Sequence, residues 1–452
     1  MASFRNNLAA RLVADTYGLA TSLVAATITA RVLGPSGRGF YASLVLLSVL
    51  FAQIFNAGLG EAVTVLVGRA AASFETAASA TVSAVVPLSV AGALAVVLTG
   101  TLVLHPASTN DRIAIGIGGL VVLCNTFGSS IAWVLVAKER IVLLAILNIV
   151  SGTTTTLLVL ALVSVVDLQT SGAMLASALG CAAILPPLLF ALARDHVSLR
   201  PVWNGGYLRA AARFGAVVQL ANLLVQMTGR LDLILVYRIA GPAPAGRYSV
   251  ALTLGALVGS VPMAIAYAAF PRLPKVTEEE APLVIAGLFR TGVAASIVCG
   301  GVLGVATPLL LPAVFGSPYQ AAVVPGLLLL PAGVFWSGQW ILCRALAARG
   351  TPRPLFVSFS CSFLVMVVLD LLLIGPAGIG GAAAASLVSS VLGFIVATVY
   401  YLAWGGHWRQ LLPRLGDVLL MVTTLREMLS AARTRRGRQA ARPAPVEVEP
   451  RA

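Results

Sequence analysis

The stretch "TARVLGPSGRGFYASLVLL", residues 29–47, places a turn with two arginines between two long apolar runs. A similar stretch, "VYRIAGPAPAGRYSVALTL", occupies residues 236–254. Pro lacks a backbone donor and Gly has no side chain, so both interrupt helices, and each stretch predicts a turn between two helices. The sequence therefore contains two similar turns, one near the start of the chain and one near its middle.

The composition around these turns is that of a membrane protein. Of 452 residues, 59% are apolar and 10% are charged, and the mean hydropathy is +0.96. Soluble domains carry about 25% charged residues. Apolar runs of about 20 residues, long enough to cross a bilayer, recur as far as Leu402. Because a membrane β-barrel would instead show short alternating strands, the pattern predicts an all-α polytopic membrane protein.

Twelve transmembrane helices are predicted from the apolar runs and the polar clusters that bound them. The first begins too late and runs too long for a cleaved signal peptide, so we expect the chain to keep it. The predicted spans are 9–30, 40–67, 77–104, 113–136, 141–166, 172–193, 214–238, 248–270, 282–311, 320–343, 355–375 and 380–404.

The distribution of positive charge predicts the orientation. With the N-terminus in the cytoplasm, five of the 30 Lys and Arg residues fall in outside segments, one lies within a span, and all the others lie inside. This asymmetry predicts that both termini are cytoplasmic. The net charge of +14 then reflects topology, with attraction to membrane lipids as a secondary effect. No nucleic-acid partner is expected. The five outside residues are Arg31, Arg38, Arg112, Arg238 and Arg247.

The two turns predict an internal repeat. Arg31, Gly34 and Pro35 match Arg238, Gly241 and Pro242, and after a two-residue insertion Gly37 and Arg38 match Gly246 and Arg247. Both turns lie outside, so the repeat is parallel, about an axis along the membrane normal. The bland alternative is two unrelated Gly/Pro turns. The repeat gives an N-terminal lobe (1–193), a cytoplasmic linker (194–213) and a C-terminal lobe (214–404).

The residues after the first helix, "ARVLGPSGRGFYA", and the end of the second, "NAGLGEAVTVLVGR", carry a family resemblance. They are similar to the oligosaccharide and polysaccharide flippases of the MOP superfamily, the Wzx-type O-antigen translocases and their relatives. The resemblance implies a V-shaped pair of lobes that alternately opens a central cavity to each side of the cytoplasmic membrane of a bacterium. It also implies a polyprenyl-diphosphate-linked glycan as the substrate, moved outward.

Polar side chains inside the predicted spans are the candidate substrate-binding residues, because charges in a bilayer are costly and normally face the protein interior or water. On the seventh span, spacings of three and four residues place a polar stripe on one helical face. On the first span, Asp15 aligns with Asn222 of that stripe under the repeat; the alternative is that Asp15 reaches interfacial water. The candidates are Arg230, Gln226, Asn222, Gln219, Asp15, Gln53 and Asn56.

Three acidic residues are candidates for ion coupling. Asp232 follows Arg230 by two residues and should face its own lobe, at a depth similar to that of Asp370. Such a pair of carboxylates would share a proton or be bridged by Na⁺. The alternative is that each acid pairs separately and only orients helices. Glu61 is the third candidate, near the inner end of the second span, where it can also reach water. No other cofactor is expected.

The remaining polar features have structural explanations. The outside arginines other than Arg112 are accounted for by helix capping and lipid headgroups, with direct substrate contact as the alternative. The five cysteines lie in or at the ends of apolar spans without metal-ligand spacing, so no metal site is expected. Residues 405–440 predict an amphipathic helix on the cytoplasmic surface, or a docking helix for glycan assembly proteins. Residues 441–452 are expected to be disordered.

A flippase for a lipid-linked oligosaccharide is the function we expect. The loops contain no nucleotide-binding motif, no nucleophile with a base and no metal cluster, so the chain is not expected to be an enzyme. The alternatives are a drug/cation antiporter of the same superfamily, which would not need Arg230, and a membrane-embedded glycan polymerase or transferase, which would need a larger outside loop. We expect a monomer.

Overall fold

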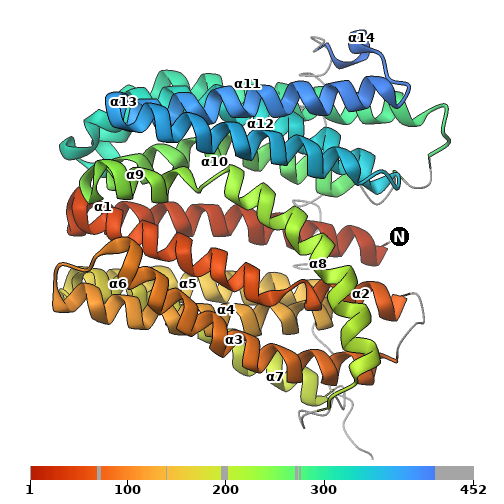
Figure 1. Ribbon diagram of the computed structural model, residues 1–452, viewed down its shortest axis with the longest axis horizontal. Coiled ribbons are helices and arrows are strands. Elements are labelled where there is room, and N and C mark those ends of the chain that lie inside the picture. The colour runs from red at the N-terminus through yellow and green to blue at the C-terminus, as the bar shows by residue number, and fades with distance from the viewer. Residues whose placement is uncertain are drawn as a thin grey trace, which may run out of the picture.

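The computed structural model describes residues 2–68, 73–138, 140–194, 202–269, 273 and 276–412. Every described element is helical (Figure 1). The N-terminal lobe comprises α1 (Ala2–Asn56), α2 (Leu59–Gly68), α3 (Phe74–Leu104), α4 (Thr109–Ala137), α5 (Ile141–Val159), the π-helical η1 (Leu160–Val165), α6 (Gln169–Ala182) and α7 (Leu185–Arg194). The C-terminal lobe comprises α8 (Gly205–Thr228), α9 (Asp232–Ala240), α10 (Pro242–Ala269), α11 (Ala281–Phe315), the 3₁₀-helical η3 (Ser317–Ala322), α12 (Val323–Ala348), α13 (Arg353–Ala403) and α14 (Trp408–Leu411).

These helices make twelve spans within the described part of the chain, as the apolar runs predicted. Nine stretches have the length and hydropathy of a membrane span. Two of them fold back on themselves at a glycine with positive φ, Gly34 in α1 and Gly378 in α13. Each of these is therefore a pair of spans, and α10 supplies one more. Glycine suits both turns because the left-handed region strains other residues.

The two lobes lie one above the other in Figure 1, with the N-terminal lobe below. We call the end that holds the Gly34 turn the Gly34 end, on the left of the view, and the opposite end, which holds the N-terminus, the N-terminal end. Helix α8 runs obliquely from the lower lobe toward the upper one, whereas α1 and α9 lie next to each other near the Gly34 end.

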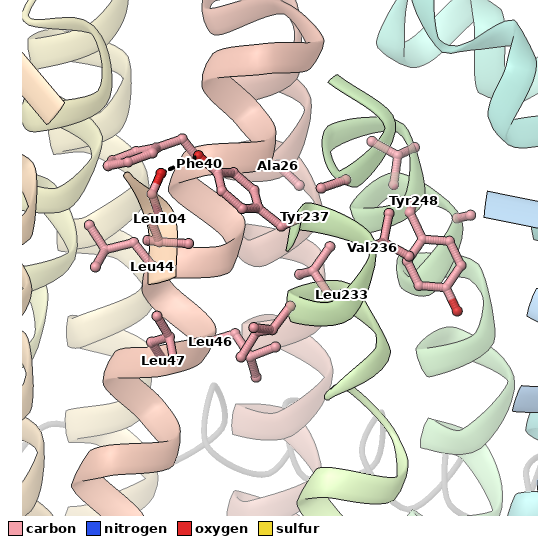
Figure 2. Close-up of a cluster of buried hydrophobic side chains, with 14 of the residues drawn as sticks. Ala26, Phe40, Leu44, Leu46, Leu47, Leu104, Leu233, Val236, Tyr237 and Tyr248 are labelled. Carbon is pink, nitrogen blue, oxygen red and sulfur yellow. Dashed lines mark hydrogen bonds between the residues drawn. The ribbon is translucent and has the colours of Figure 1, made fainter. Parts of the chain in front are cut away.

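An apolar cluster closes the seam between the lobes at the Gly34 end (Figure 2). Phe40, Leu44 and Leu104 enter it from the N-terminal lobe, and Val236 and Tyr237 enter it from α9. Burying a large apolar side chain away from water is worth about 1.5–3 kcal/mol. The Tyr237 hydroxyl also donates to the Leu104 carbonyl oxygen at 3.0 Å. The lobes are thus held together by shared hydrophobic packing at this end.

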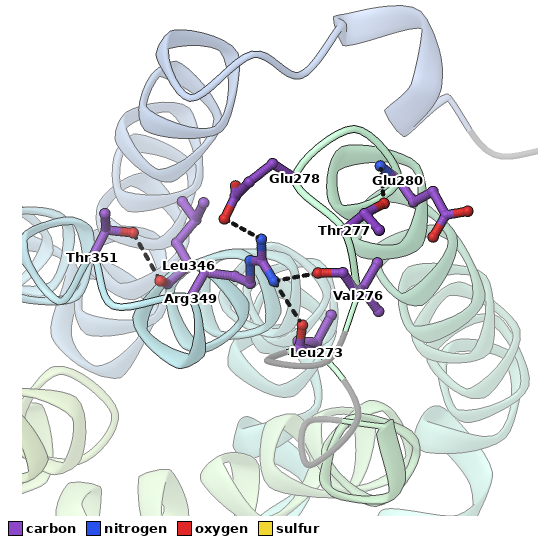
Figure 3. Close-up of polar contacts among 8 residues, drawn as sticks. All are labelled: Leu273, Val276, Thr277, Glu278, Glu280, Leu346, Arg349 and Thr351. Atoms are coloured by element: carbon purple, nitrogen blue, oxygen red, sulfur yellow. Dashed lines mark hydrogen bonds and ion pairs between the residues drawn. The ribbon is translucent and has the colours of Figure 1, made fainter.

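Polar contacts organise the N-terminal end of the C-terminal lobe (Figure 3). Arg349, just past the end of α12, donates to the carbonyl oxygens of Leu273 (3.0 Å) and Val276 (2.7 Å) and forms an ion pair with Glu278. These contacts fix the connection between α10 and α11 against α12.

The structure differs from the expected linker, residues 194–213, and describes only part of the expected C-terminal segments. Helix α8 begins at Gly205, because the Asn204 side chain accepts a hydrogen bond from the Tyr207 amide at 3.0 Å and caps the helix. The helix thus starts inside the expected linker of residues 194–213. The expected amphipathic segment 405–440 is described only to Leu412, and the expected disordered tail 441–452 lies outside the described residues.

Candidate functional site

The repeated turns meet at the seam, where a glycine from each contacts the other turn. A Cβ atom on Gly39 would clash with the carbonyl oxygen of Pro242, and one on Gly246 would clash with that of Pro35. The contact is reciprocal, so Pro35 corresponds to Pro242 and Gly39 to Gly246, and the two turns align in sequence without an insertion. The expected two-residue insertion was therefore wrong, because Gly39, and not Gly37, is the counterpart of Gly246.

The arginines at the start of each turn repeat this symmetry. Arg31 donates from Nε to the carbonyl oxygen of Val314 at 2.7 Å, at the end of α11. Arg238 donates from Nη1 to the carbonyl oxygen of Val103 at 3.5 Å, at the end of α3. Because α3 and α11 are the third spans of their lobes, each arginine contacts the equivalent helix of the opposite lobe. The lobes are thus related by a parallel pseudo-two-fold axis, and both arginines act across the seam.

Toward the N-terminal end, α8 crosses the seam with polar contacts. The Gln219 side chain, 5% exposed, donates to the carbonyl oxygen of Gln53 at 2.6 Å and to its side-chain oxygen at 3.0 Å. The backbones of Gly58 and Gly215 touch one turn farther along. Two of the expected substrate-binding residues, Gln219 and Gln53, therefore lie at the interface between the lobes and bind each other.

The two candidate asparagines have other partners. Asn222 accepts a hydrogen bond from Arg344 on α12 at 3.0 Å. Asn56 is 3% exposed and accepts one from Ser130 on α4 at 2.6 Å, inside the N-terminal lobe. In this conformation Asn56 lies inside the N-terminal lobe, and its role in substrate binding stays a prediction. Helix α1 ends at Asn56, where Ala57 and Gly58 take positive φ and redirect the chain.

Arg230 lies where the seventh span is interrupted. Helix α8 ends at Thr228 and α9 begins at Asp232, so the helical stripe that passes through half-buried Gln226 is broken before it reaches Arg230. Arg230 is exposed, and its side chain forms no hydrogen bond or ion pair with the described residues, although Asp232 lies within electrostatic range. It lies ten residues before the end of α9 at Ala240, which corresponds to about 15 Å of helix, half the thickness of the hydrocarbon core.

Asp232 and Asp370 are both buried in the C-terminal lobe, at 1% and 0% exposure. The Asp232 carboxylate accepts hydrogen bonds from the Tyr248 hydroxyl, from the Ser386 hydroxyl at 2.9 Å and from the Leu233 amide at 2.8 Å. Asp370 lies within electrostatic range of Asp232, yet neither of its carboxylate oxygens has a hydrogen-bond partner among the described residues. A buried carboxylate without donors is costly unless it is protonated or binds a cation.

The other acidic candidates lie in the N-terminal lobe. Glu61 is half-buried in the first turn of α2, with one buried carboxylate oxygen that has no partner among the described residues. Asp15 is half-buried on α1. Neither lies next to the buried acids of the C-terminal lobe along the chain or in the fold, so they are separate features.

Residues that the sequence analysis did not single out complete the acidic site. Tyr248 and Ser386 contact Asp232, and their counterparts in the N-terminal lobe are Tyr41 and Ser177, whose hydroxyls pair at 3.0 Å. Where Asp232 stands in one lobe, the repeat places Ala25 in the other. The ungapped alignment of the two turns aligns the tyrosines and would have identified them. The acid is thus an addition to a tyrosine–serine pair that both lobes share.

Known proteins share this architecture. A family model described as "Polysaccharide biosynthesis protein" matches residues 5–277. Curated protein sequences give no significant match. The lipid II flippase MurJ in an inward closed conformation superposes with a TM-score of 0.70 at 10% identity, over 93% of this chain and 92% of that one.

Two transporter structures are also similar. An inward-facing multidrug resistance MATE family transporter of the MOP superfamily gives a TM-score of 0.66 at 13% identity, over 85% of this chain and 95% of that one. The Vibrio cholerae MATE transporter VcmN in its bent form gives 0.54 at 14%, over 89% and 98%. The family match spans more than half of the chain and the fold agrees with it, so this protein belongs to the polysaccharide biosynthesis protein family and has the V-shaped, two-lobed fold of MOP superfamily transporters.

Proposed function

We propose that this transporter is a flippase that moves a polyprenyl-diphosphate-linked oligosaccharide across the cytoplasmic membrane by alternating access. The observation that carries the proposal is Arg230, an exposed guanidinium near the middle of the seventh span without an ion pair among the described residues. A charge at this depth costs at least about 2.5–3.5 kcal/mol in lipid, so it should face a water-filled space between the lobes. A guanidinium there suits a diphosphate group, which it can bind through two parallel hydrogen bonds.

The difference between the two ends of the seam supports alternating access. The Gly34 end is packed with apolar side chains around the Gly39 and Gly246 contact. Toward the N-terminal end, α8 packs its own apolar residues against α2, its Gly215 touches Gly58, and Gln219 adds hydrogen bonds to Gln53. Polar contacts of this kind exchange readily for water, because a hydrogen bond is worth only about 0.5–1.5 kcal/mol net. Opening at the N-terminal end would thus exchange the Gln219 hydrogen bonds for water as well as separate α8 from α2, whereas opening at the Gly34 end would break the apolar cluster.

The distribution of arginine orients this cycle. Among the described residues, most Lys and Arg side chains belong to segments at the N-terminal end, which the positive-inside rule assigns to the cytoplasm. The Gly34 end then faces outward in the inner membrane, and both termini are cytoplasmic. Substrate would enter from the cytoplasm, move past Arg230 and leave at the Gly34 end.

Ion coupling is assigned to the buried acids of the C-terminal lobe. Asp232 bonds Tyr248 and Ser386, and Asp370 lies within electrostatic range of Asp232. These oxygens would serve as ligands to a hard cation such as Na⁺ or as hydrogen-bond partners of a protonated carboxyl group. In either form, binding of the cation or proton removes the charge conflict between two buried carboxylates. Coupling of the gradient to transport would follow if the loaded and empty sites favour different lobe arrangements.

The competing functions fit less well. A drug/cation antiporter would repel its substrate from Arg230, which has no carboxylate bound to it among the described residues. The related solved structures are transporters and flippases, which gives no support to a polymerase or transferase. We further propose that the protein acts as a monomer within the membrane lipids, with its C-terminal segment on the cytoplasmic surface and docking of glycan assembly proteins there as the alternative.

The proposal is tested by deleting the gene in its native host and analysing the polyprenyl-linked intermediates by mass spectrometry. If the protein is such a flippase, the deletion strain should accumulate an undecorated or complete oligosaccharide unit on its lipid carrier at the cytoplasmic face. Reintroducing the wild-type protein should clear it. A deletion strain whose lipid-linked intermediates match those of the parent, while a drug or cation accumulates in the cells, would favour the antiporter instead.

A further inference from the structure

Arg38 is a buried cation without a counter-ion at the Gly34 end of the seam. Only 9% of it is exposed. One guanidinium nitrogen donates to the Thr29 hydroxyl at 2.7 Å, and the group lies 5.5 Å from the centre of the Tyr41 ring. Nε has no hydrogen-bond partner in the part of the chain that the structure describes. It forms no ion pair with any described residue. Burying an unpaired charge costs several kcal/mol, and such residues are normally kept for a function.

The opposite lobe provides the cover over Arg38. Tyr319 of η3, 1% exposed, lies within electrostatic range of both Arg38 and Arg247. Its hydroxyl donates to the Ala30 carbonyl oxygen at 3.0 Å, and Arg247 donates to the Pro318 carbonyl oxygen at 3.1 Å. Because η3 belongs to the C-terminal lobe, it must move away from Arg38 when the lobes separate at this end.

Arg31 is released by the same movement. Its guanidinium binds the carbonyl oxygens of Val314 and Ala313, both on α11 of the C-terminal lobe. Arg31 and Arg38 lie on either side of the Gly34 turn of one lobe, so both stay together when the partners leave. Opening at the Gly34 end therefore takes the other lobe's carbonyl oxygens away from Arg31 and the cover away from Arg38, which leaves two guanidinium groups that need an anion.

We propose that Arg31 and Arg38 form a second binding site for a diphosphate group, created when the seam opens at the Gly34 end. The inference rests on the proposed function for the identity of the natural ligand, the diphosphate of the lipid carrier. Two guanidiniums match a diphosphate through paired, charge-assisted hydrogen bonds. A ligand that binds only the open state shifts the lobes toward it by its differential affinity. The site thus draws the substrate from Arg230 toward the exit and favours the outward-open state.

Inorganic pyrophosphate is the probe for this site. Spin labels are placed at Ser36→Cys and Ser317→Cys, two exposed positions on opposite lobes at the Gly34 end, after the native cysteines are replaced by alanine. Pyrophosphate should increase the population with the longer label separation in protein held in neutral detergent. Arg38→Gln and Arg31→Gln should each raise the pyrophosphate concentration needed by at least about tenfold. Arg112→Gln, an exposed arginine of α4, is the matched control and should leave it unchanged.

Several results would overturn the site. The site would be rejected if pyrophosphate left the wild-type label distances unchanged. It would also be rejected if pyrophosphate acted on Arg31→Gln and Arg38→Gln at the same concentration as on the wild type. Arg31 is exposed, so its variant remains informative if Arg38→Gln folds poorly. In nanodiscs, opening by phosphatidylglycerol with no further effect of pyrophosphate would make this a headgroup site and reject the substrate assignment. None of these measurements involves a glycan, so the site can fail while the flippase function stands. Conversely, a deletion strain with unchanged lipid-linked intermediates would reject the function and leave pyrophosphate binding intact.

Discussion

Gly39 and Gly246 touch across the seam, each with its Cα facing the carbonyl oxygen of the other lobe's turn proline, Pro242 or Pro35. No side chain fits at either position, because a methyl group would overlap the opposing backbone. Overpacking of this kind costs about 1–3 kcal/mol or forces the structure to move. The two glycines therefore permit the closed state of the Gly34 end.

Gly39→Ala should populate the state that is open at this end. The Ser36 and Ser317 label pair described above should show a longer mean separation without any ligand, with a population change of about tenfold for 1.4 kcal/mol. Gly301→Ala, on α11 in open space, is the control. Identical distance distributions for the two variants would show that the glycine contact does not hold the lobes.

Tyr248→Phe should weaken ion coupling, since it removes a donor to Asp232 and keeps the ring. Transport measured against Na⁺ concentration and against pH should show a higher requirement for one of these ions, with a smaller effect on the maximal rate. Tyr41→Phe removes the equivalent hydroxyl of the other lobe, which contacts only Ser177 among the described side chains, and should leave the ion dependence unchanged. Equal shifts in both variants would argue against a coupling site in the C-terminal lobe alone.

Asp232→Asn and Asp370→Asn should behave as one site. Each substitution alone is expected to lower coupled transport by about tenfold or more, and the double variant should be little worse than the more damaged single one, because interacting residues are not additive. Glu75→Gln, an exposed carboxylate on α3, controls for charge removal. If the losses of the two single variants simply multiplied in the double variant, the acids would act independently.

Arg349→Ala should loosen the connection between α10 and α11. The substitution leaves the Leu273 and Val276 carbonyl oxygens without their donor and Glu278 without its partner. Losing hydrogen bonds to a buried charged group costs about 1.5–3 kcal/mol each, and a lower thermal midpoint in detergent should follow. Arg353→Ala, exposed at the start of α13, should unfold like the wild type. The same midpoint for both variants would show that this cluster contributes no stability.

The helices could be predicted from the sequence because length and hydropathy determine a membrane span. The Gly34 and Gly241 turns appeared directly as Gly-Pro pairs between apolar runs. The break in the seventh span at Gly229 could not be predicted, because one glycine in an apolar helix is common and only tertiary contacts decide whether the helix continues. The stripe through Gln219 and Gln226 was therefore extended one step too far.

The partners of polar residues were much harder to predict. Helical spacing gives the direction of a side chain relative to its own helix, but not which helix lies opposite. Gln219 and Asn222 share a face of α8, yet one bonds α1 of the other lobe and the other bonds Arg344 of its own lobe. Arg31 caps a helix, as one part of its expected role, but the helix is α11 of the other lobe, whose carbonyl oxygens lie hundreds of residues away in sequence.

The role of Arg230 in guiding the diphosphate is tested by transport in proteoliposomes that contain Arg230→Ala and the lipid-linked oligosaccharide isolated from the deletion strain. The variant should insert and fold normally but move the substrate at least about a hundredfold more slowly, while Arg230→Lys retains part of the rate because it keeps the charge without the bidentate geometry. Arg209→Ala, an exposed arginine at the N-terminal end of α8, should transport like the wild type. Full activity of Arg230→Ala would contradict the claim that this guanidinium guides the diphosphate through the seam.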